Sequence, residues 1–347
     1  MKFLFVFIIL VSCIAQANRA IQSEQYFSDL TPVRVRILKN QRLEDIKTRI
    51  KDLPEYFQQL KIIQASSVRE LKQYDLILTL NMRDYLAGVL SGEMPLTWPL
   101  EALKSQAVVA RSYALAKMIE SQLQHYDVDS DHMDQVFKFK IDNRALKAID
   151  ETRDLVLSLD INKSRKFEIV KAYYHSDCGG QTVPAQTIWP GAVDTGITQD
   201  PMCLHRKNDW TFFIDKKIIE NRDEIKIKKN QSKIIEIAGY TIQKLRQRFG
   251  FSQIKNSPIN VQLTSQHLIL TGKGYGHGAG LCQWGSRDWA LRGFSYKAIL
   301  RHYYPKVELL SLEQLSTKKS LTQLQLNQRI IKRQFAENIQ SAESFKN

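Results

Sequence analysis

Residues 85–115 read YLAGVLSGEMPLTWPLEALKSQAVVARSYAL, and this stretch predicts two helices joined by a short turn. The first helix is expected over 82–91 and should end at Gly92, because glycine favours helix C-termini. Pro99 suits the first turn of the second helix, and Glu101 complements the dipole at its N-terminus. Apolar residues at helical spacing then form one stripe for the core: Leu103, Ala107, Ala110, Ala114 and Met118.

Glu93 lies in the turn between these two helices and has apolar neighbours. Apolar surroundings disfavour the charged form of a carboxyl group. A carboxylic acid that stays neutral near pH 7 can protonate a glycosidic oxygen. Its position alone nevertheless favours a structural role, in which Glu93 accepts backbone N–H bonds at the start of the next helix.

The N-terminus and the charge indicate an exported protein with an acidic partner. The 347-residue chain has a formal net charge of +14, which suits nucleic acid, anionic lipid or cell wall. Residues 1–17 combine Lys2, a short apolar run and the sequence AQA, and they predict a signal peptide cleaved after Ala17. In an alternative interpretation, Cys13 lies in a lipobox and becomes a lipid anchor. Export argues against a nucleic-acid partner, and no transmembrane segment is expected after cleavage.

The remaining pattern predicts an α+β fold with mixed strands, one long helix, several short helices and an open substrate cleft. We expect an N-terminal extension over 18–74 that packs on a core domain over 75–305. The core carries a polar, irregular insertion around 123–168, and a polar C-terminal tail covers 306–347. Further elements are expected as strands over 33–37, 74–80 and 169–174, and as helices over 239–248, 282–291 and 295–303.

The segment YHSDCGG over 174–180 brings imidazole, hydroxyl, carboxylate and thiol groups to the end of a strand. Signal cleavage would leave three of the four cysteines. An odd number in an oxidising compartment indicates one disulfide with a free thiol, or a metal site. The spacing of His175, Cys178, Cys203 and His205 suits structural zinc, and a Cys178–Cys203 disulfide is an equally good interpretation.

Two other chemistries are open to this cluster. A Cys/His nucleophile pair is conceivable, and a catalytic zinc would make the protein a hydrolase. Catalytic zinc usually keeps a water position and seldom combines two thiolates with so few other ligands, which disfavours the hydrolase.

Residues 272–280, GKGYGHGAG, form a loop with five glycines. The loop lacks the Gly-Lys-Ser/Thr ending of a phosphate-binding loop. Glycines let the backbone approach a ligand closely, so we expect His277 and Gln283 to supply polar contacts there. A lone histidine is usually structural, but one flanked by glycines on both sides is a better candidate.

In this order, the three segments resemble the SpoIID/LytB family, stage II sporulation protein D and its relatives. The matching stretches are QAVVARSYAL, HSDCGGQT before Trp189, and GYGHGAGLCQWGSRDWALRGFSYKAILRHYYP, and the resemblance covers roughly 75–305. The resemblance implies a lytic transglycosylase of peptidoglycan with Glu93 as its catalytic glutamate. Glu93 would protonate the oxygen between N-acetylmuramic acid and N-acetylglucosamine, and would then act as the base on the C6 hydroxyl. The product would be a 1,6-anhydro end, and no second carboxylate would be required.

The resemblance also implies ligands and partners. Some relatives hold structural zinc, which matches His175 and Cys178, with Cys203 and His205 as an extension of that set. Cys282 stands where relatives usually carry serine and is not expected to be a ligand. The expected substrate is glycan strands stripped of stem peptides, often beside an amidase; the alternative is a non-catalytic peptidoglycan-binding modifier of an amidase. The expected substrate-binding residues are Lys104, Gln106, Arg111, Tyr113, Ser176, Gly276, His277 and Gln283.

Overall fold

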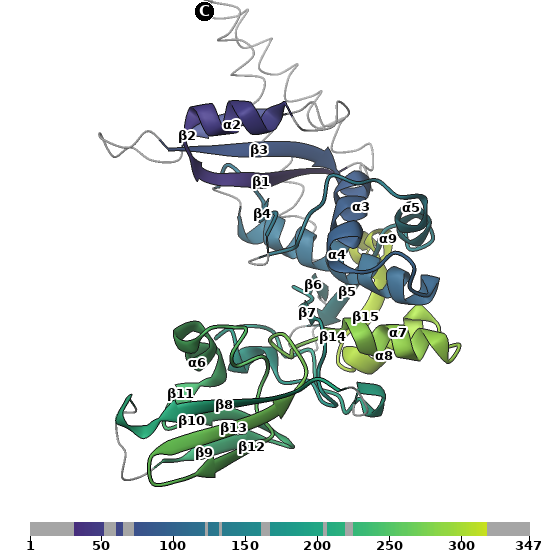
Figure 1. The fold of residues 1–347 in the computed structure, drawn as a ribbon. Helices are drawn as coiled ribbons and strands as arrows, with labels where there is room; N and C mark the ends of the chain where they lie inside the picture. Colours follow the sequence, from purple (N-terminus) through teal and green to yellow (C-terminus); the bar gives the residue numbers. More distant parts are fainter. Residues whose placement is uncertain are drawn as a thin grey trace, which may run out of the picture.

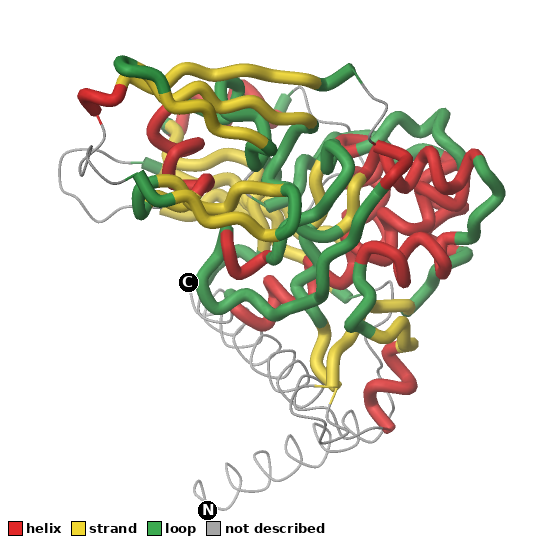
Figure 2. Tube along the Cα trace, turned by 90° about the horizontal axis from the view of Figure 1, so that it is seen from below, coloured by secondary structure: helices red, strands yellow, loops and turns green. Residues whose placement is uncertain are grey.

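The computed structural model describes residues 31–51, 60–64, 73–121, 124–131, 134–160, 167–203, 207–218 and 225–317. The predicted signal peptide, Cys13, His205 and the part of the tail beyond residue 317 lie outside the described residues. Helices alternate with strands, and the strands form several open sheets, which confirms the predicted α+β class. Figure 2 shows most helices (red) gathered on one side of the molecule and many of the strands (yellow) on the other.

A four-stranded sheet with the order β2-β3-β1-β4 forms one end of the molecule (Figure 1). Its strands are β1 (Pro32–Gln41), β2 (Leu60–Gln64), β3 (Tyr74–Asn81) and β4 (Val128–Asp129), and α2 (Leu43–Ile50) follows β1. Arg36 joins three of the strands, because its guanidinium pairs with Asp129 at 2.6 Å and with Asp75 at 3.3 Å. The N-terminal residues therefore share one sheet with the region that follows them.

The helix pair expected from the sequence is present as α3 (Met82–Glu93) and α4 (Leu100–Glu120). The side chain of Asn81 caps α3 by accepting the backbone N–H of Asp84 at 2.8 Å. The predicted end of α3 at Gly92 is wrong, because the helix continues to Glu93 and the backbone becomes extended only at Met94. This extra residue places the Glu93 side chain on the last turn of a rigid helix.

Helix α4 is buried on more than the one predicted face. All five residues of the predicted stripe lie in the main core cluster. Val108 and Val109 lie in a second cluster, and α4 packs against α3, α5, α7 and α8. The alanine-rich sequence allows these close approaches, so α4 is the central helix of the fold rather than a surface helix.

The segment 123–168, expected to be irregular, contains β4, α5 (Asn143–Asp150), β5 (Leu155–Asp160) and β6 (Phe167–Ile169). Strand β5 lies between β6 and β15 (Glu308–Ser311), and α9 (Leu312–Thr317) follows β15. The first residues of the expected tail therefore complete a sheet of the core. The aromatic ring of Phe137 packs in the main core, where it stacks against Tyr85.

A β-rich lobe with its own hydrophobic core is formed by the chain between 209 and 273 (Figure 1). It contains two three-stranded sheets, with the orders β12-β13-β8 and β11-β10-β9. The expected helix near 239–248 is α6 (Ile242–Phe249). The strands are β8 (Asp209–Asp215), β9 (Ile227–Asn230), β10 (Lys233–Ile237), β11 (Tyr240–Thr241), β12 (Asn260–Leu263) and β13 (His267–Lys273).

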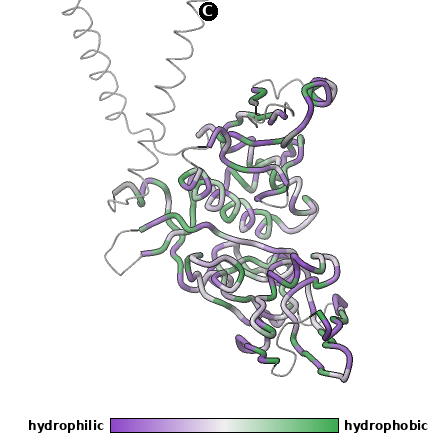
Figure 3. Tube along the Cα trace, turned by 90° about the vertical axis from the view of Figure 1, so that its left-hand side faces the viewer, coloured by the Kyte–Doolittle hydropathy of each residue, from purple (hydrophilic) through white to green (hydrophobic). Residues whose placement is uncertain are grey.

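The second and third sequence motifs meet in a short parallel pair, β7 (Tyr174–His175) with β14 (Leu281–Cys282). Helices α7 (Gln283–Leu291) and α8 (Tyr296–Tyr303) follow directly, close to the positions that the sequence predicted. The short 3-10 turns are η2 (Ala185–Thr187), η3 (Pro201–Cys203) and η4 (Lys216–Ile218). Short hydrophobic and hydrophilic stretches follow one another along the trace (Figure 3). None of the described helices is long and apolar enough to span a membrane.

Candidate active site

The Glu93 carboxyl group accepts three hydrogen bonds from three different segments. The backbone N–H of Val136 donates to Oε1 at 2.7 Å, and the Tyr174 hydroxyl donates to the same oxygen at 3.0 Å. The side-chain amide of Gln283 donates to Oε2 at 3.4 Å. Helix α3, the loop before α5, strand β7 and helix α7 therefore converge on one half-buried carboxyl group.

Two glycines of α3 make the contact with Val136 possible. The carbonyl of Gly88 accepts the backbone N–H of Lys138 at 3.1 Å. A Cβ atom on Gly92 would lie 2.9 Å from the carbonyl carbon of Val136, which is closer than side chains tolerate. The absence of side chains at both positions lets residues 136–138 lie directly against α3, so that the Val136 N–H points at Glu93.

Burial raises the pKa of Glu93, and the hydrogen bonds from Val136, Tyr174 and Gln283 oppose this rise only in part. Burial and the neighbouring Glu93 raise the pKa of Tyr174 well above its usual value, so its phenol stays protonated and remains a donor. Gln135 donates to the Tyr174 hydroxyl at 3.3 Å and accepts from Tyr85 at 2.8 Å. This buried chain fixes the Tyr174 hydroxyl at one place beside Glu93.

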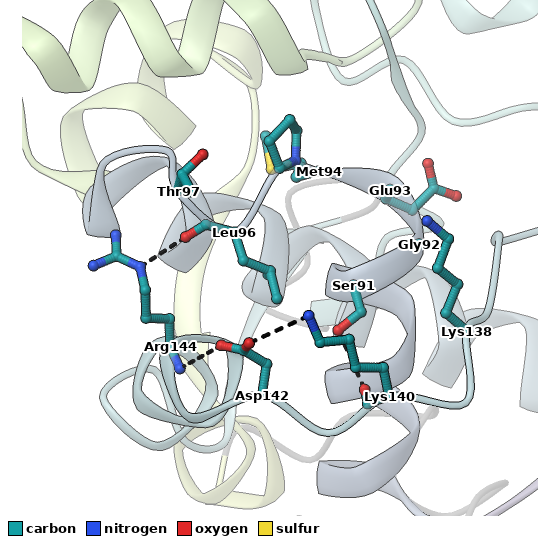
Figure 4. Close-up of a pocket in the computed structure, with 11 residues that line it drawn as sticks. Ser91, Gly92, Glu93, Met94, Leu96, Thr97, Lys138, Lys140, Asp142 and Arg144 are labelled. Atoms are coloured by element: carbon teal, nitrogen blue, oxygen red, sulfur yellow. Dashed lines mark hydrogen bonds and ion pairs between the residues drawn. The ribbon is translucent and has the colours of Figure 1, made fainter.

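A pocket of about 580 Å³ opens beside Glu93 (Figure 4). One side of its lining is the end of α3 and the turn that follows. The other side includes three basic residues: Lys138 and Lys140 from the segment before α5, and Arg144 from the first turn of α5. Asp142, the other carboxylate in the lining, caps α5 by accepting the Arg144 N–H at 2.9 Å. The lining residues are Ser91, Gly92, Glu93, Met94, Pro95, Leu96, Thr97, Lys138, Lys140, Asp142 and Arg144.

Of the eight expected substrate-binding residues, the structure brings Gln283 into direct contact with Glu93. Two others are held by partners outside the pocket lining. Lys104 pairs with Glu101 at 2.7 Å and with Glu151 at 2.5 Å. Arg111 is buried and donates to the carbonyls of Thr152 at 2.9 Å and Leu155 at 3.2 Å, just after α5. These contacts indicate that Lys104 and Arg111 stabilise the fold.

The other expected contacts are also outside the pocket lining. Gln106 is completely buried within α4, and Tyr113 donates to Asp134 at 2.7 Å. The Ser176 carbonyl accepts the Trp284 N–H at 3.1 Å, and Gly276 has a φ of 108° directly against His175.

His277 packs edge-on against Trp189 at 4.8 Å and lies 6.2 Å from the Tyr173 ring. Burial holds the pKa of His277 well below its usual value, so its ring is neutral. His277 also lies 5.5 Å from the His175 ring.

A second cluster, which we call the thiol cluster, consists of Asp177, Cys178, Cys203 and Cys282. One ligand atom from each residue lies within 4.8 Å of the others, and all four residues are buried. The three cysteines are free thiols, and the sulfurs of Cys203 and Cys282 are 3.4 Å apart. Tetrahedral zinc with Zn–S bonds of about 2.3 Å needs ligand sulfurs roughly 3.8 Å apart, so this donor set fits zinc.

The thiol cluster differs from the zinc set expected from the sequence. His175 is absent from it, His205 lies outside the described residues, and Cys282, which the sequence argument set aside, is a member. Cys282 is the N-cap of α7, and its sulfur accepts the backbone N–H of Cys178 at 3.2 Å and of Gly285 at 3.3 Å. The parallel pairing of β7 with β14 brings this sulfur into the cluster.

The charges around the thiol cluster also suit an anionic centre. Although burial opposes it, hydrogen bonds from Cys178, Cys203 and His175 hold the pKa of the Cys282 thiol well below its usual value. The ammonium of Lys233 is fully buried nearby, 3.2 Å from the Lys273 carbonyl, and burial lowers its pKa to about 8. Burial raises the pKa of Cys178, so Cys282 is the member of the cluster that favours the thiolate, and a buried cation nearby offsets its charge.

Three contributors to the site were not expected from the sequence. Tyr174 begins the YHSDCGG segment, and its place beside that motif was the available signal. Val136 acts through its backbone N–H, which no side-chain pattern can reveal. Lys138 lies in a segment that the sequence marked only as polar.

Comparison with known proteins finds similar sequences. Residues 70–159 match the family model SpoIID, described as stage II sporulation protein. An uncharacterised protein of Brachyspira hyodysenteriae is 30% identical over 258 residues, which cover 68% of each chain. Stage II sporulation protein D of Bacillus amyloliquefaciens is 25% identical, with coverage of 68% of this chain and 76% of the relative. The amidase enhancer of Bacillus subtilis is 26% identical over 65% of this chain, which spans only 40% of that relative.

The family match covers α3, α4 and α5, and so includes both Glu93 and Val136. The full-length relatives extend the similarity to about two thirds of the chain. The chain belongs to the SpoIID/LytB family.

Proposed function

We propose that the protein is a peptidoglycan lytic transglycosylase that cleaves the bond between N-acetylmuramic acid and N-acetylglucosamine. The observation that carries this proposal is the half-buried Glu93 carboxyl group beside a pocket, with a raised pKa and three fixed hydrogen-bond donors. A raised pKa favours the protonated carboxyl group that an acid step needs, and rigid donors stabilise the carboxylate that forms when it gives up its proton.

The reaction needs one carboxyl group in two successive roles. Glu93 donates its proton to the glycosidic oxygen, and the bond from C1 of the muramic ring to that oxygen breaks, leaving an oxocarbenium-like ring. The Glu93 carboxylate then takes the proton of the C6 hydroxyl, whose oxygen forms a bond to C1. Glu93 is protonated again at the end, and the product is a 1,6-anhydro ring.

This route suits a site with one available carboxylate. Glycoside hydrolases generally need two carboxyl groups, one of which activates water or forms a covalent intermediate. Asp142, the other carboxylate in the described pocket lining, is engaged as a helix cap and is paired with Lys140 at 3.6 Å. We propose glycan strands without stem peptides as the substrate, because the pocket is open and lined by cations.

Mass spectrometry of the soluble products from intact and amidase-treated sacculi tests this proposal. The protein should release 1,6-anhydro products, with more from amidase-treated sacculi, and Glu93→Gln should release none. Reducing-end products without the anhydro ring would show that water, and not the C6 hydroxyl, attacks C1.

We also propose that the thiol cluster holds a structural zinc ion through Asp177, Cys178, Cys203 and Cys282. Zinc there would supply a cross-link and no step of the reaction. Cys282 immediately precedes Gln283, so a fixed Cys282 would hold the Gln283 amide against Glu93. Metal analysis of the purified protein tests the proposal, with one zinc ion per chain as the expected result.

We propose export through the N-terminal signal to the periplasm or the cell-wall space. In the alternative form of this proposal, a lipid attached at Cys13 anchors the protein.

The similarity to an amidase enhancer favours a second candidate function, in which the protein binds peptidoglycan and modifies an amidase. If Glu93→Gln enhances a cell-wall amidase as well as the wild-type protein does, that function is independent of the carboxyl group.

A further inference from the structure

Among the three basic residues that line the pocket beside Glu93, Lys138 is the one whose cationic group has neither a hydrogen bond nor an ion pair within the described residues. Arg144 donates to the carbonyls of Leu96 and Trp98, both at 2.7 Å, and so holds the turn after α3. Lys140 pairs with Asp142 at 3.6 Å. Lys138 is exposed, and Figure 4 draws its side chain along the pocket beside Gly92 with no interaction ending on its ammonium.

The backbone that carries Lys138 also positions Glu93. The Lys138 N–H donates to the Gly88 carbonyl at 3.1 Å, and two residues earlier the Val136 N–H donates to Glu93 at 2.7 Å. The ammonium and the carboxyl group therefore line one pocket from the two sides of the same close contact.

The substrate class of the proposed function carries an anion on the same ring as the reacting bond. The muramic ring bears a lactyl group on C3, and the bond that Glu93 would protonate begins at C1 of the same ring. The lactyl carboxylate is free in a strand without stem peptides and becomes an uncharged amide where a peptide is attached. An ammonium without an ion-pair partner beside the pocket attracts the free carboxylate by its charge and lacks this attraction to the amide.

We propose that Lys138 is a specificity-determining residue that binds the lactyl carboxylate of the muramic ring next to the scissile bond. This inference rests on the proposed function, because it assumes that this ring enters the pocket with its C1 towards Glu93. It assigns the recognition of peptide-free glycan to one side chain. The exposed position of Lys138 makes the contribution moderate, about 2- to 5-fold in affinity.

The test measures binding by calorimetry in the Glu93→Gln background, so that no substrate is consumed. The probes are a tetrasaccharide from amidase-treated sacculi with free lactyl carboxylates, and the same tetrasaccharide with these carboxylates converted to methylamides. We expect Glu93→Gln to bind the free acid about 2- to 5-fold more tightly than the amide, with a smaller ratio at high salt. Adding Lys138→Met should bring the ratio close to one, whereas Lys138→Arg should retain most of it.

Lys147→Met is the matched control, because Lys147 is an exposed lysine of α5 outside the pocket lining. An unchanged ratio in Lys138→Met overturns the inference, as does equal loss in Lys147→Met or equal binding of both probes by Glu93→Gln. The anhydro products of the wild-type protein report separately on the proposed function. Product release together with an unchanged ratio would leave the transglycosylase intact and remove only the role of Lys138.

Discussion

Replacing Gly88 by alanine tests how the fold positions Glu93. Helix propensity alone predicts that Gly88→Ala stabilises the protein by about 1 kcal/mol, because glycine is a poor residue for a helix interior. The structure predicts the opposite sign. The added Cβ atom would lie 2.6 Å from Cδ2 of Phe137 and 2.7 Å from the carbonyl oxygen of Lys138, whereas ordinary contacts between carbon atoms are about 3.5–4.0 Å.

These two neighbours cannot move independently. The Phe137 ring stacks on Tyr85 at 6.0 Å and meets Phe139 edge-on at 5.3 Å. The Lys138 backbone is hydrogen bonded to Gly88 itself. Relief of the clash therefore requires residues 136–138 to move away from α3. Overpacking of this kind costs about 1–3 kcal/mol, so after the gain in helix propensity we expect a net loss of about 1 kcal/mol.

The same movement withdraws the Val136 N–H from Glu93. Displacement of a catalytic contact by about 1 Å can lower the rate by up to two orders of magnitude. We expect Gly88→Ala to lower the midpoint of thermal unfolding by a few degrees and to lower kcat at least about tenfold at temperatures where the variant is fully folded.

Thermal unfolding followed by circular dichroism, with product release measured at a low temperature, checks both effects. Adding Phe137→Leu should make the combined stability cost smaller than the sum of the two separate costs, because the second change opens room for the first. A Gly88→Ala protein that is about 1 kcal/mol more stable than the wild type and fully active would refute this account of the contact between α3 and 136–138.

The other predictions concern the acid, its hydroxyl partner and the thiol cluster. Tyr174→Phe removes a donor that lowers the pKa of Glu93, so the decline of kcat/KM with rising pH should move to higher pH, and a pH–rate profile in which this limb is unmoved would contradict the assignment. Burial raises the folded-state pKa of Glu93, so the contribution of this residue to stability is present at low pH and is lost as pH rises through that pKa. We therefore expect Glu93→Gln to be about 1 kcal/mol more stable than the wild type at about pH 8 and equally stable near pH 4. Urea unfolding at the two pH values measures this difference. Cys282→Ser should lower the zinc content of the purified protein well below that of the wild type, and full zinc retention would remove Cys282 from the ligand set.

The helix pair could be predicted because its signals are local. Pro99, Glu101 and the apolar spacing of α4 are all read within one segment, and the order of the three motifs identifies the family. The extent of burial of α4 could not be predicted in this way, because its second face is covered by α7 and α8, which lie far along the chain. The short helix and strands within 123–168 were not predicted, because polar residues dominate that segment.

The composition of the site depends on contacts between residues that are far apart in the chain, and these contacts cannot be inferred from one sequence. Cys178 and Cys282 are 104 residues apart in the sequence, and the parallel pairing of β7 with β14 brings them together. The serine that relatives usually carry in place of Cys282 pointed away from a role in metal binding. Glu93 could be put forward as a candidate from the motifs, but its three donors come from a backbone amide and two distant side chains.

The central claim is that Glu93 alone performs the acid and the base step on the glycan strand. The most direct measurement compares the wild-type protein with Glu93→Gln on amidase-treated sacculi and identifies the soluble products by mass spectrometry. The account predicts 1,6-anhydro-muramic products from the wild type and none from Glu93→Gln, with both proteins folded and both bound to the sacculi. Equal release of anhydro products by the two proteins, or release by neither, would contradict it.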